Sequence, residues 1–300
     1  MEFITLNDDV INEISNYLFI TDSINMLSVN STFNSKKNKV FYNMWINIKK
    51  IQNLWYYDRF RCLIIYDKLS KYNISNNVLG LCIGSNSFFF DKEDTIPNSV
   101  THLIFNRHFN QDIKGFIPNS VIYLKFNDSF NQDIKDAIPN SVTHLIFGND
   151  FNQDIKDAIP NSIIHLTFGR YFNQDIKGAI LNSVTHLTFG YCFNQDVKGA
   201  IPNSVTHLTF GYNFNQDIKD ALPSSLTHLT FGWCFNKDIQ GAILNSLIEL
   251  TLGHDFRGNI NDYILNNVKK LVLSSVSCEL NVTNYRLQTI HDGKLIIVRN

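Results

Sequence analysis

Histidine is the side chain whose repetition in this sequence most directly suggests chemistry. It opens the same His-Leu-x-Phe pattern six times, at His102, His144, His165, His186, His207 and His228. Imidazoles on neighbouring parallel strands would lie roughly 4.8 Å apart, close enough to consider a shared zinc ion. The column is uniform, however, and lacks the Cys, Asp or Glu partners that complete a metal site. We therefore favour stacking of the rings, and we predict no metal and no cofactor.

The same histidines suggest sensitivity to pH. Protonation of several adjacent imidazoles would place like charges in a row and weaken that face of the structure. The sequence thus carries a milder hypothesis, acid sensitivity, alongside the structural interpretation.

Aspartate, lysine and asparagine also repeat in register, and none of them forms a unique site. Aspartates run from Asp112 to Asp217 and lysines from Lys114 to Lys219. We expect these to be solvated columns on the convex face, whereas the asparagines should bond backbone groups of a bend and of its neighbour. A catalytic group copied in every repeat is implausible, and the sequence has no glycine-rich phosphate loop and no G-x-S-x-G motif. We predict a protein that is not an enzyme.

These columns exist because the chain repeats with a constant step. Equivalent aliphatic residues are 21 positions apart, at Ile96, Ile117, Ile138, Ile159, Ile180, Ile201, Leu222, Ile243 and Ile264. Units of this length cannot bury a core alone and must stack. The period predicts a leucine-rich-repeat-like solenoid with a parallel β-sheet on its concave face.

One repeat shows how each coil should be built. Val205-x-x-Leu208-x-Phe210 matches a leucine-rich-repeat core, so its apolar side chains should point inward. Pro202-Asn203-Ser204 should form the turn before the strand, and Phe214 should belong to a buried aromatic column. Three positions are then expected to face outward: His207, Thr209 and Gly211.

The period divides the chain into four regions. Residues 1–50 lack it and read as a small α-helical module of three short helices, of which Asn7 and Asp22 could cap the first two and Trp45 lies in the third. Residues 51–95 read as a linker with irregular first coils, and residues 96–275 as the regular repeats. Residues 276–300 should form a cap hairpin around an Asp292-Gly293 turn.

Composition narrows the setting and the partners. The formal net charge of −1 supplies no field for polyanions, which argues against nucleic acid. No signal-peptide pattern and no long apolar run occur, so we expect neither secretion nor membrane insertion. Five cysteines without CxxC spacing read as reduced thiols: Cys62, Cys82, Cys192, Cys234 and Cys278. These features favour a cytoplasmic or nuclear protein, or the host cytoplasm if the protein is viral.

The N-terminal apolar pattern resembles an F-box. The order is Leu6-Asn7-Asp8-Asp9-Val10, then Asp22-Ser23-Ile24 and Leu27-Ser28-Val29, then Trp45, with Asn7 where that family usually has proline. The resemblance covers about one sixth of the chain and implies docking on a Skp1-like adaptor. The implied contacts are Leu6, Val10, Ile14, Leu18, Leu27 and Val29.

The repeats resemble FNIP repeats, a leucine-rich-repeat-like family with a Phe-Asn and Ile-Pro signature. Residues 130–139, Phe-Asn-Gln-Asp-Ile-Lys-Asp-Ala-Ile-Pro, carry it. The two resemblances together imply a substrate-recognition adaptor of a cullin-type (SCF) ubiquitin ligase, monomeric within a larger complex. The alternative is a protein-binding repeat scaffold with no ubiquitin link.

The expected target surface consists of the positions that differ from coil to coil within an otherwise conserved 21-residue repeat. The position after the recurrent small residue becomes aromatic in successive coils, and exposed Tyr and Trp are favoured interface anchors. We predict that the target contacts Tyr171, Tyr191, Tyr212 and Trp233, together with His186, His207 and His228. The alternative is that these rings simply cover the edge of the sheet.

Overall fold

The computed structural model describes residues 42–54, 56–84, 95–243, 245–274, 286–289 and 295–298. In this part of the chain, 14 strands form one sheet in the order β1 to β12, then β14 and β13. The strands are β1 Tyr42–Asn47, β2 Phe60–Ile65, β3 Gly80–Ile83, β4 His102–Phe105, β5 Tyr123–Phe126, β6 His144–Ile146, β7 His165–Thr167, β8 His186–Thr188, β9 His207–Thr209, β10 His228–Thr230, β11 Glu249–Leu252, β12 Lys270–Leu273, β13 Arg286–Thr289 and β14 Leu295–Val298.

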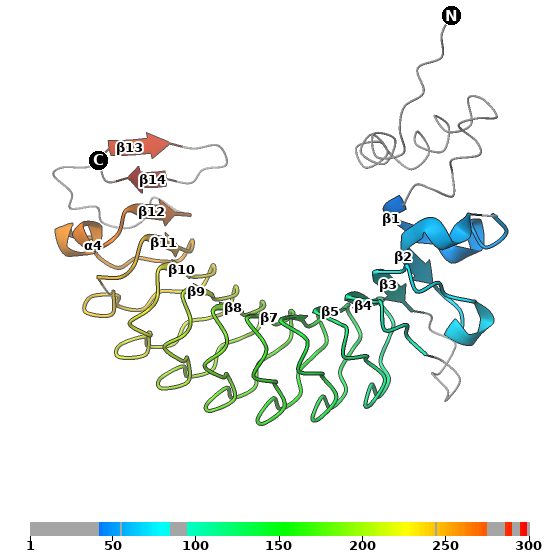
Figure 1. Ribbon diagram of the computed structural model, residues 1–300. Coiled ribbons are helices and arrows are strands. Elements are labelled where there is room, and N and C mark those ends of the chain that lie inside the picture. The colour runs from blue at the N-terminus through cyan, green and yellow to red at the C-terminus, as the bar shows by residue number, and fades with distance from the viewer. Residues whose placement is uncertain are drawn as a thin grey trace, which may run out of the picture.

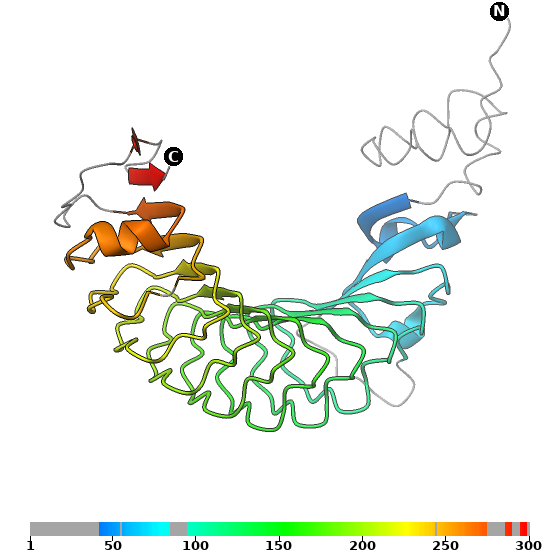
Figure 2. The ribbon, with the colours of Figure 1, turned by 60° about the vertical axis from the view of Figure 1, so that its left-hand side comes forward.

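The coils stack into an arc, and the sheet lines its inner side. Successive strands from β1 to β12 pair in parallel, whereas the bends of the coils lie on the convex side (Figures 1 and 2). Helices are short: η1 Ile48–Lys50, η2 Tyr57–Arg59, η3 Leu69–Lys71 and α4 Asp262–Asn267. No helix in the described ranges is long and apolar enough to cross a membrane. The expected leucine-rich-repeat-like solenoid with a concave parallel sheet is confirmed.

Two columns of phenylalanine fill the core behind the sheet. Phe210 and Phe214 of one coil stack with ring centroids 3.7 Å apart, and Phe214 stacks on Phe193 of the coil before at 6.2 Å. Leu208 beside them is 1% exposed and Phe214 is 0% exposed. Offset stacking adds to the free energy of burying each ring. Hydrophobic burial is therefore continuous from coil to coil, as the 21-residue period predicts.

A column of glycines lets the backbones of neighbouring coils touch. A Cβ atom on Gly211 would overlap the carbonyl oxygen of Gly190, and one on Gly190 would overlap that of Gly169. This corrects the expectation that Gly211 merely faces outward: its missing side chain is what permits the close approach. Earlier in the chain, Asn106 and Asn127 hold the equivalent position, and strands β4 and β5 there are four residues long instead of three.

The bend on the convex side depends on a left-handed residue in each coil. Gly178 has φ 74°, and the equivalent Asp157 and Asp220 have φ 58° and 59°. Gly and Asp are among the residues that best tolerate this region. Three residues earlier in each coil an aspartate shapes the same bend: Asp175 Oδ1 accepts a hydrogen bond from the backbone N–H of Lys177 at 2.9 Å. The aspartate column is exposed, and it also forms part of the turn.

The asparagine column bonds coil to coil. Asn152 Oδ1 accepts from the backbone N–H of Asn173 at 2.9 Å and from Nε2 of Gln174 at 3.0 Å. The same bond, from the backbone N–H of the residue 21 positions later to the asparagine side chain, recurs from Asn110 to Asn236. The interpretation of these residues as structural is confirmed.

The two ends differ from the regular coils. Strand β1 begins at Tyr42, so the third expected helix is wrong: Trp45 lies in the first strand of the sheet, paired with Cys62 of β2, and its indole lies against Gly80. Side chains of a regular strand alternate between its two faces, but the register of β1 shifts between Tyr42 and Trp45, so this strand lacks the alternation that would have identified it. At the other end β14 pairs antiparallel with both β12 and β13. These strands flank the expected Asp292-Gly293 turn, which lies outside the described residues.

Candidate functional site

The histidines form one continuous stack on the concave face. Strand register places His144, His165, His186, His207 and His228 side by side. Their ring centroids are 4.1–4.3 Å apart, and each ring is half-buried. The favoured interpretation of ring stacking agrees with this geometry.

A threonine hydroxyl orients most of these rings. Thr206 Oγ1 lies 2.9 Å from His207 Nδ1 and 3.3 Å from the carbonyl oxygen of Thr185 in the preceding coil. A hydroxyl that donates to the carbonyl can accept from an Nδ1–H, which leaves Nε2 of the ring as an acceptor. The bond recurs beside His102, His144, His186 and His228, whereas His165 follows Ile164 and has no such hydroxyl.

Stacking favours the neutral imidazole. Burial lowers the pKa of His165, His186 and His207, and neighbouring imidazoles lower it further. Among the described residues, no group of three or more His, Cys, Asp or Glu side chains could hold a metal ion. Beyond His228 the column continues as Glu249, which pairs with Lys270 at 3.0 Å.

The predicted aromatic residues form a second stack, at the C-terminal ends of the strands. We call Arg170, Tyr191, Tyr212, Trp233 and His254 the ridge. Successive ring centroids are 4.5, 5.7 and 4.1 Å apart from Tyr191 to His254, and the guanidinium of Arg170 lies 4.9 Å from the Tyr191 ring. Tyr171 lies one position further along its coil and contacts the same guanidinium at 5.5 Å. The 21-residue step places Arg170 and His254 in this column, but the sequence prediction did not include them among the contacts, because their stacking on Tyr191 and Trp233 depends on side-chain direction.

The early half of the same column is polar and internally paired. Arg107 Nε donates to Asp128 Oδ2 at 2.7 Å, and Asn149 Nδ2 donates to Asp128 Oδ1 at 2.6 Å. Variation along the column therefore serves pairing between neighbouring coils as well as any contact with a target. Position-to-position variation does not by itself identify a binding surface.

Stacking leaves ring edges, rather than ring faces, as the exposed part of the ridge. The flat faces of Tyr212 are taken by Tyr191 and Trp233, so a sugar or nucleobase has no free face there on which to stack. Tyr191 and Trp233 are nevertheless 39% and 44% exposed. Their available chemistry is an apolar edge with Tyr O–H and Trp N–H donors.

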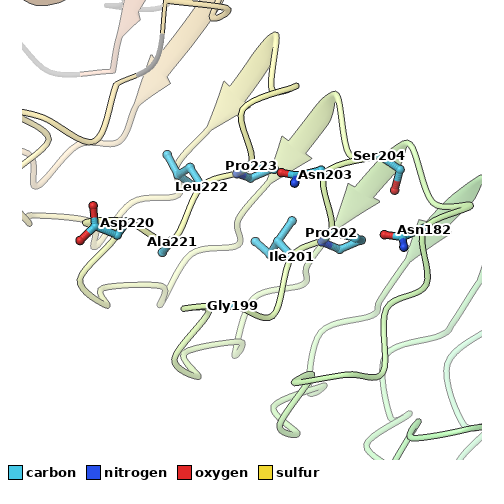
Figure 3. A pocket seen from close by; sticks show the side chains of 10 residues that line it. All are labelled: Asn182, Gly199, Ile201, Pro202, Asn203, Ser204, Asp220, Ala221, Leu222 and Pro223. Carbon is cyan, nitrogen blue, oxygen red and sulfur yellow. The ribbon is translucent and has the colours of Figure 1, made fainter.

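A separate lateral groove recurs at the turns that precede the strands. Figure 3 shows one instance, in which three neighbouring coils supply Asn182, then Gly199 with residues 201–204, and residues 220–223. Its volume is about 610 Å³, and an equivalent groove of about 370 Å³ contains Asp136 and Asp157. The smaller one has an aspartate in both left-handed positions where the larger has Gly199 and Asp220. The groove follows from the repeat signature and lies away from the ridge.

Four of the five cysteines lie in the described parts of the chain. Cys62, Cys82, Cys192 and Cys234 are free thiols, and burial raises the pKa of Cys82 to about 11. Cys278 lies outside the described residues. So do all six predicted adaptor contacts: Leu6, Val10, Ile14, Leu18, Leu27 and Val29.

The fold and its concave face define a repeat-based, leucine-rich-repeat-like protein-binding scaffold. Residues 92–129, 109–150, 151–192, 193–234 and 214–255 match the FNIP Repeat family, so that matches cover residues 92–255. The chain belongs to this family, as the signature at residues 130–139 predicts.

A solved structure supports the same fold. The crystal structure of CroV588, described as a novel circular LRR protein, is 36% identical to this chain with a TM-score of 0.67. The match covers 79% of this chain and 40% of that one, so this chain spans less than half the length of CroV588. A comparison with curated proteins finds no match.

Proposed function

We propose that the concave face of strands β7–β11 holds a protein target, and that the ridge is its main anchor. The observation that carries this proposal is the row of stacked, partly exposed aromatic side chains beside strands β8–β10, which contain no Asp, Glu, Lys or Arg. Tyr, Trp and Arg dominate the energetic centres of protein interfaces, and Tyr and Trp bury large areas with few rotatable bonds. The neighbouring His and Thr columns would surround this anchor with hydrogen-bonding groups.

The target-binding proposal is tested by a triple substitution, Tyr191→Ala/Tyr212→Ala/Trp233→Ala. Proximity labelling with the full chain should lose its specific partners in this variant. A matched triple on the convex side, Lys177→Ala/Lys198→Ala/Lys219→Ala, should keep them. Equal labelling by both variants would contradict the proposal, provided that circular dichroism shows both to be folded.

We further propose that the chain acts as the substrate-recognition subunit of a cullin-type ubiquitin ligase. Support comes from the F-box resemblance of residues 6–29, joined to a solenoid suited to hold a target. Residues 1–50 would dock on a Skp1-like adaptor, and catalysis would come from the recruited enzyme. In this role the protein acts in the cytoplasm or nucleus as a single copy within a larger complex.

The ligase proposal is tested by deletion up to residue 41. The structure sets this boundary, because strand β1 begins at Tyr42 and a longer deletion would remove part of the sheet. We expect a Skp1-like protein to co-purify with the full chain and to be lost from the truncated one. Normal target binding by both forms, with no adaptor detected in either, would favour a repeat scaffold without a ubiquitin link.

A further inference from the structure

The charged residues of strands β4–β12 leave one cation without an acidic partner. The residues of these strands that carry a charge are Lys125, Glu249 and Lys270. Lys270 Nζ lies 3.0 Å from each carboxylate oxygen of Glu249, so these two charges neutralise one another. Lys125 forms no ion pair with any described residue. On this part of the concave sheet, the charge that remains uncompensated is positive.

The column that contains the ridge repeats this arrangement. Arg107 and Asp128 form an ion pair at 2.7 Å, whereas Arg170 forms none with any described residue. Asp150 belongs to the coil before Arg170, and the two side chains do not pair. Arg170 is exposed at the start of the ridge, where a group carried by a partner can reach it.

Two aromatic rings hold the guanidinium of Arg170. Its central carbon lies 4.9 Å from the ring centroid of Tyr191 and 5.5 Å from that of Tyr171. Stacking occupies the flat face of the guanidinium and leaves its in-plane N–H donors, which no described residue accepts. An arginine held in this way presents a planar fork that matches the two oxygens of a carboxylate, and it loses less conformational entropy on binding than a free side chain.

Lys125 is held between apolar neighbours instead. Strand register places Ile104 on one side of it and Ile146 on the other, and the lysine is half-buried. Its aliphatic stem can pack along these isoleucines while the ammonium stays at the surface. An ammonium in such a setting has lost part of its hydration and has gained no opposite charge. A carboxylate from a partner would restore that balance.

The two cations suit separate carboxylates rather than one polyanionic group. Two strand spacings, about 9.6 Å, separate the coils of Lys125 and Arg170. Phosphorylated groups are usually bound by clusters of arginine, whereas a single guanidinium is present here. Nucleic acid would need free aromatic faces for its bases, but the ring faces of the ridge are stacked on one another. The chemistry therefore favours Asp and Glu side chains of a protein segment.

Beyond Arg170 the character of the surface changes. Strands β8–β10 contain no Asp, Glu, Lys or Arg, and Tyr191 and Trp233 expose apolar ring edges beside them. A carboxylate placed there would lose hydration without gaining a cation. A matching segment is therefore acidic at one end and apolar at the other.

We propose that the target segment bound on the concave face is acidic where it meets Lys125 and Arg170, and apolar where it lies along Tyr191 and Trp233. One carboxylate accepts from the fork of Arg170, and a second pairs with the ammonium of Lys125. This inference rests on the proposed protein-binding function and names the chemistry of the target.

The test uses the full chain and a fluorescently labelled decapeptide, with glutamate in its first half and alternating phenylalanine and serine in its second. Fluorescence anisotropy should show saturable binding of this acidic peptide. The same peptide with glutamine in place of glutamate should bind at least ~10-fold more weakly. Added salt should weaken binding of the acidic peptide, because it screens the ion pairs.

Substitution of the cations locates the binding. Arg170→Gln should weaken binding of the acidic peptide ~5- to 10-fold and leave the glutamine peptide unchanged; Lys125→Gln should weaken it by ~3-fold. Arg107→Gln is the matched control, because it removes the same charge from the same column but from an arginine already paired with Asp128. Its effect should stay below ~3-fold. Asn149 shows that this column accepts an uncharged polar side chain, so both arginine variants should fold.

Three results would overturn the inference. They are equal binding of the glutamate and glutamine peptides, equal losses in the two arginine variants, and tighter binding of single-stranded DNA or of a phosphoserine peptide than of the glutamate peptide. If the acidic peptide fails to bind while the alanine triple still abolishes target labelling, the inference is wrong and the protein-binding proposal stands. If the alanine triple also keeps its partners, both proposals are wrong.

Discussion

The asparagine column and the ridge both join one coil to the next, but they do so in opposite ways. Asn152 and its equivalents repeat one residue and one hydrogen bond along the array. The ridge column changes its pairing at almost every step, from an ion pair at Arg107 and Asp128 to stacking at Tyr212 and Trp233. Lateral contact therefore does not require identical residues. Columns that repeat one residue hold the backbone conformation of each coil. The varied column also maintains contact between coils, but its exposed side chains can differ from coil to coil.

The largest effect should come from the copied glycine column. Gly211→Ala places a Cβ atom into the Gly190 carbonyl and should destabilise the fold by about 3 kcal/mol or more. Gly199→Asp is the matched control, because its Cβ meets nothing within 4 Å and aspartate already holds the equivalent left-handed position at Asp220. Thermal and urea melts should separate the two clearly. If Gly211→Ala loses little stability, neighbouring coils can move apart at a small cost in free energy, contrary to this prediction.

Removal of one amide from the asparagine column should cost less. Asn152→Ala leaves the backbone N–H of Asn173 without its acceptor, and we expect a loss of about 1–3 kcal/mol. Asn110→Ala at the exposed start of the column is the comparison and should cost less, since water can replace the lost acceptor. Equal losses of stability at the two sites would show that burial of the unpaired N–H is not the reason for the cost.

The histidine stack should make stability depend on pH. His165, His186 and His207 have folded-state pKa values below the ordinary one, so the unfolded chain binds more protons as pH falls below about 6.5. Their contribution is complete above that pH and is lost progressively toward the lowered folded-state pKa values. Melting temperature should be lower at pH 5.5 than at pH 7.5. A variant with these three residues changed to glutamine should show a smaller difference in melting temperature between the two pH values. If that difference is the same as in the wild type, groups other than these histidines cause it.

The smallest effect is expected in the polar half of the varied column. Arg107 is exposed, so Asp128→Ala should change stability by at most about 1 kcal/mol despite the 2.7 Å ion pair. The ion pair should contribute still less in 1 M salt, where screening is short-ranged. A loss as large as that of Asn152→Ala would remove the distinction between copied and varied columns.

The sequence predicts most of the scaffold because its strongest signals are periodic. Inward Leu208 and Phe210 follow from alternation along a strand, and the 21-residue step gives the stacking. Periodicity gives faces but not distances between backbones, which is why the role of Gly211 was missed. The left-handed position could have been predicted, because only Gly or Asp occurs at this place in the repeat, as at Gly178 and Asp157, and both residue types tolerate positive φ.

The candidate site was harder to predict than the scaffold. Tyr191, Tyr212 and Trp233 are in adjacent coils by simple counting, so their proximity was predictable. Arg170 joins them through a cation–π contact that depends on side-chain direction. Trp45 was misassigned because three- and four-residue apolar spacing over a short segment cannot distinguish a helix from an irregular edge strand.

The backbone contact through the glycine column has a consequence for how this family can diversify. Because Gly169, Gly190 and Gly211 seat each coil on the main chain of the one before, coil placement is independent of the side chain that follows each glycine. Whole 21-residue units could be exchanged, duplicated or removed while their neighbours still fit. New specificities could then arise by reordering existing coils, with no need to redesign the interior.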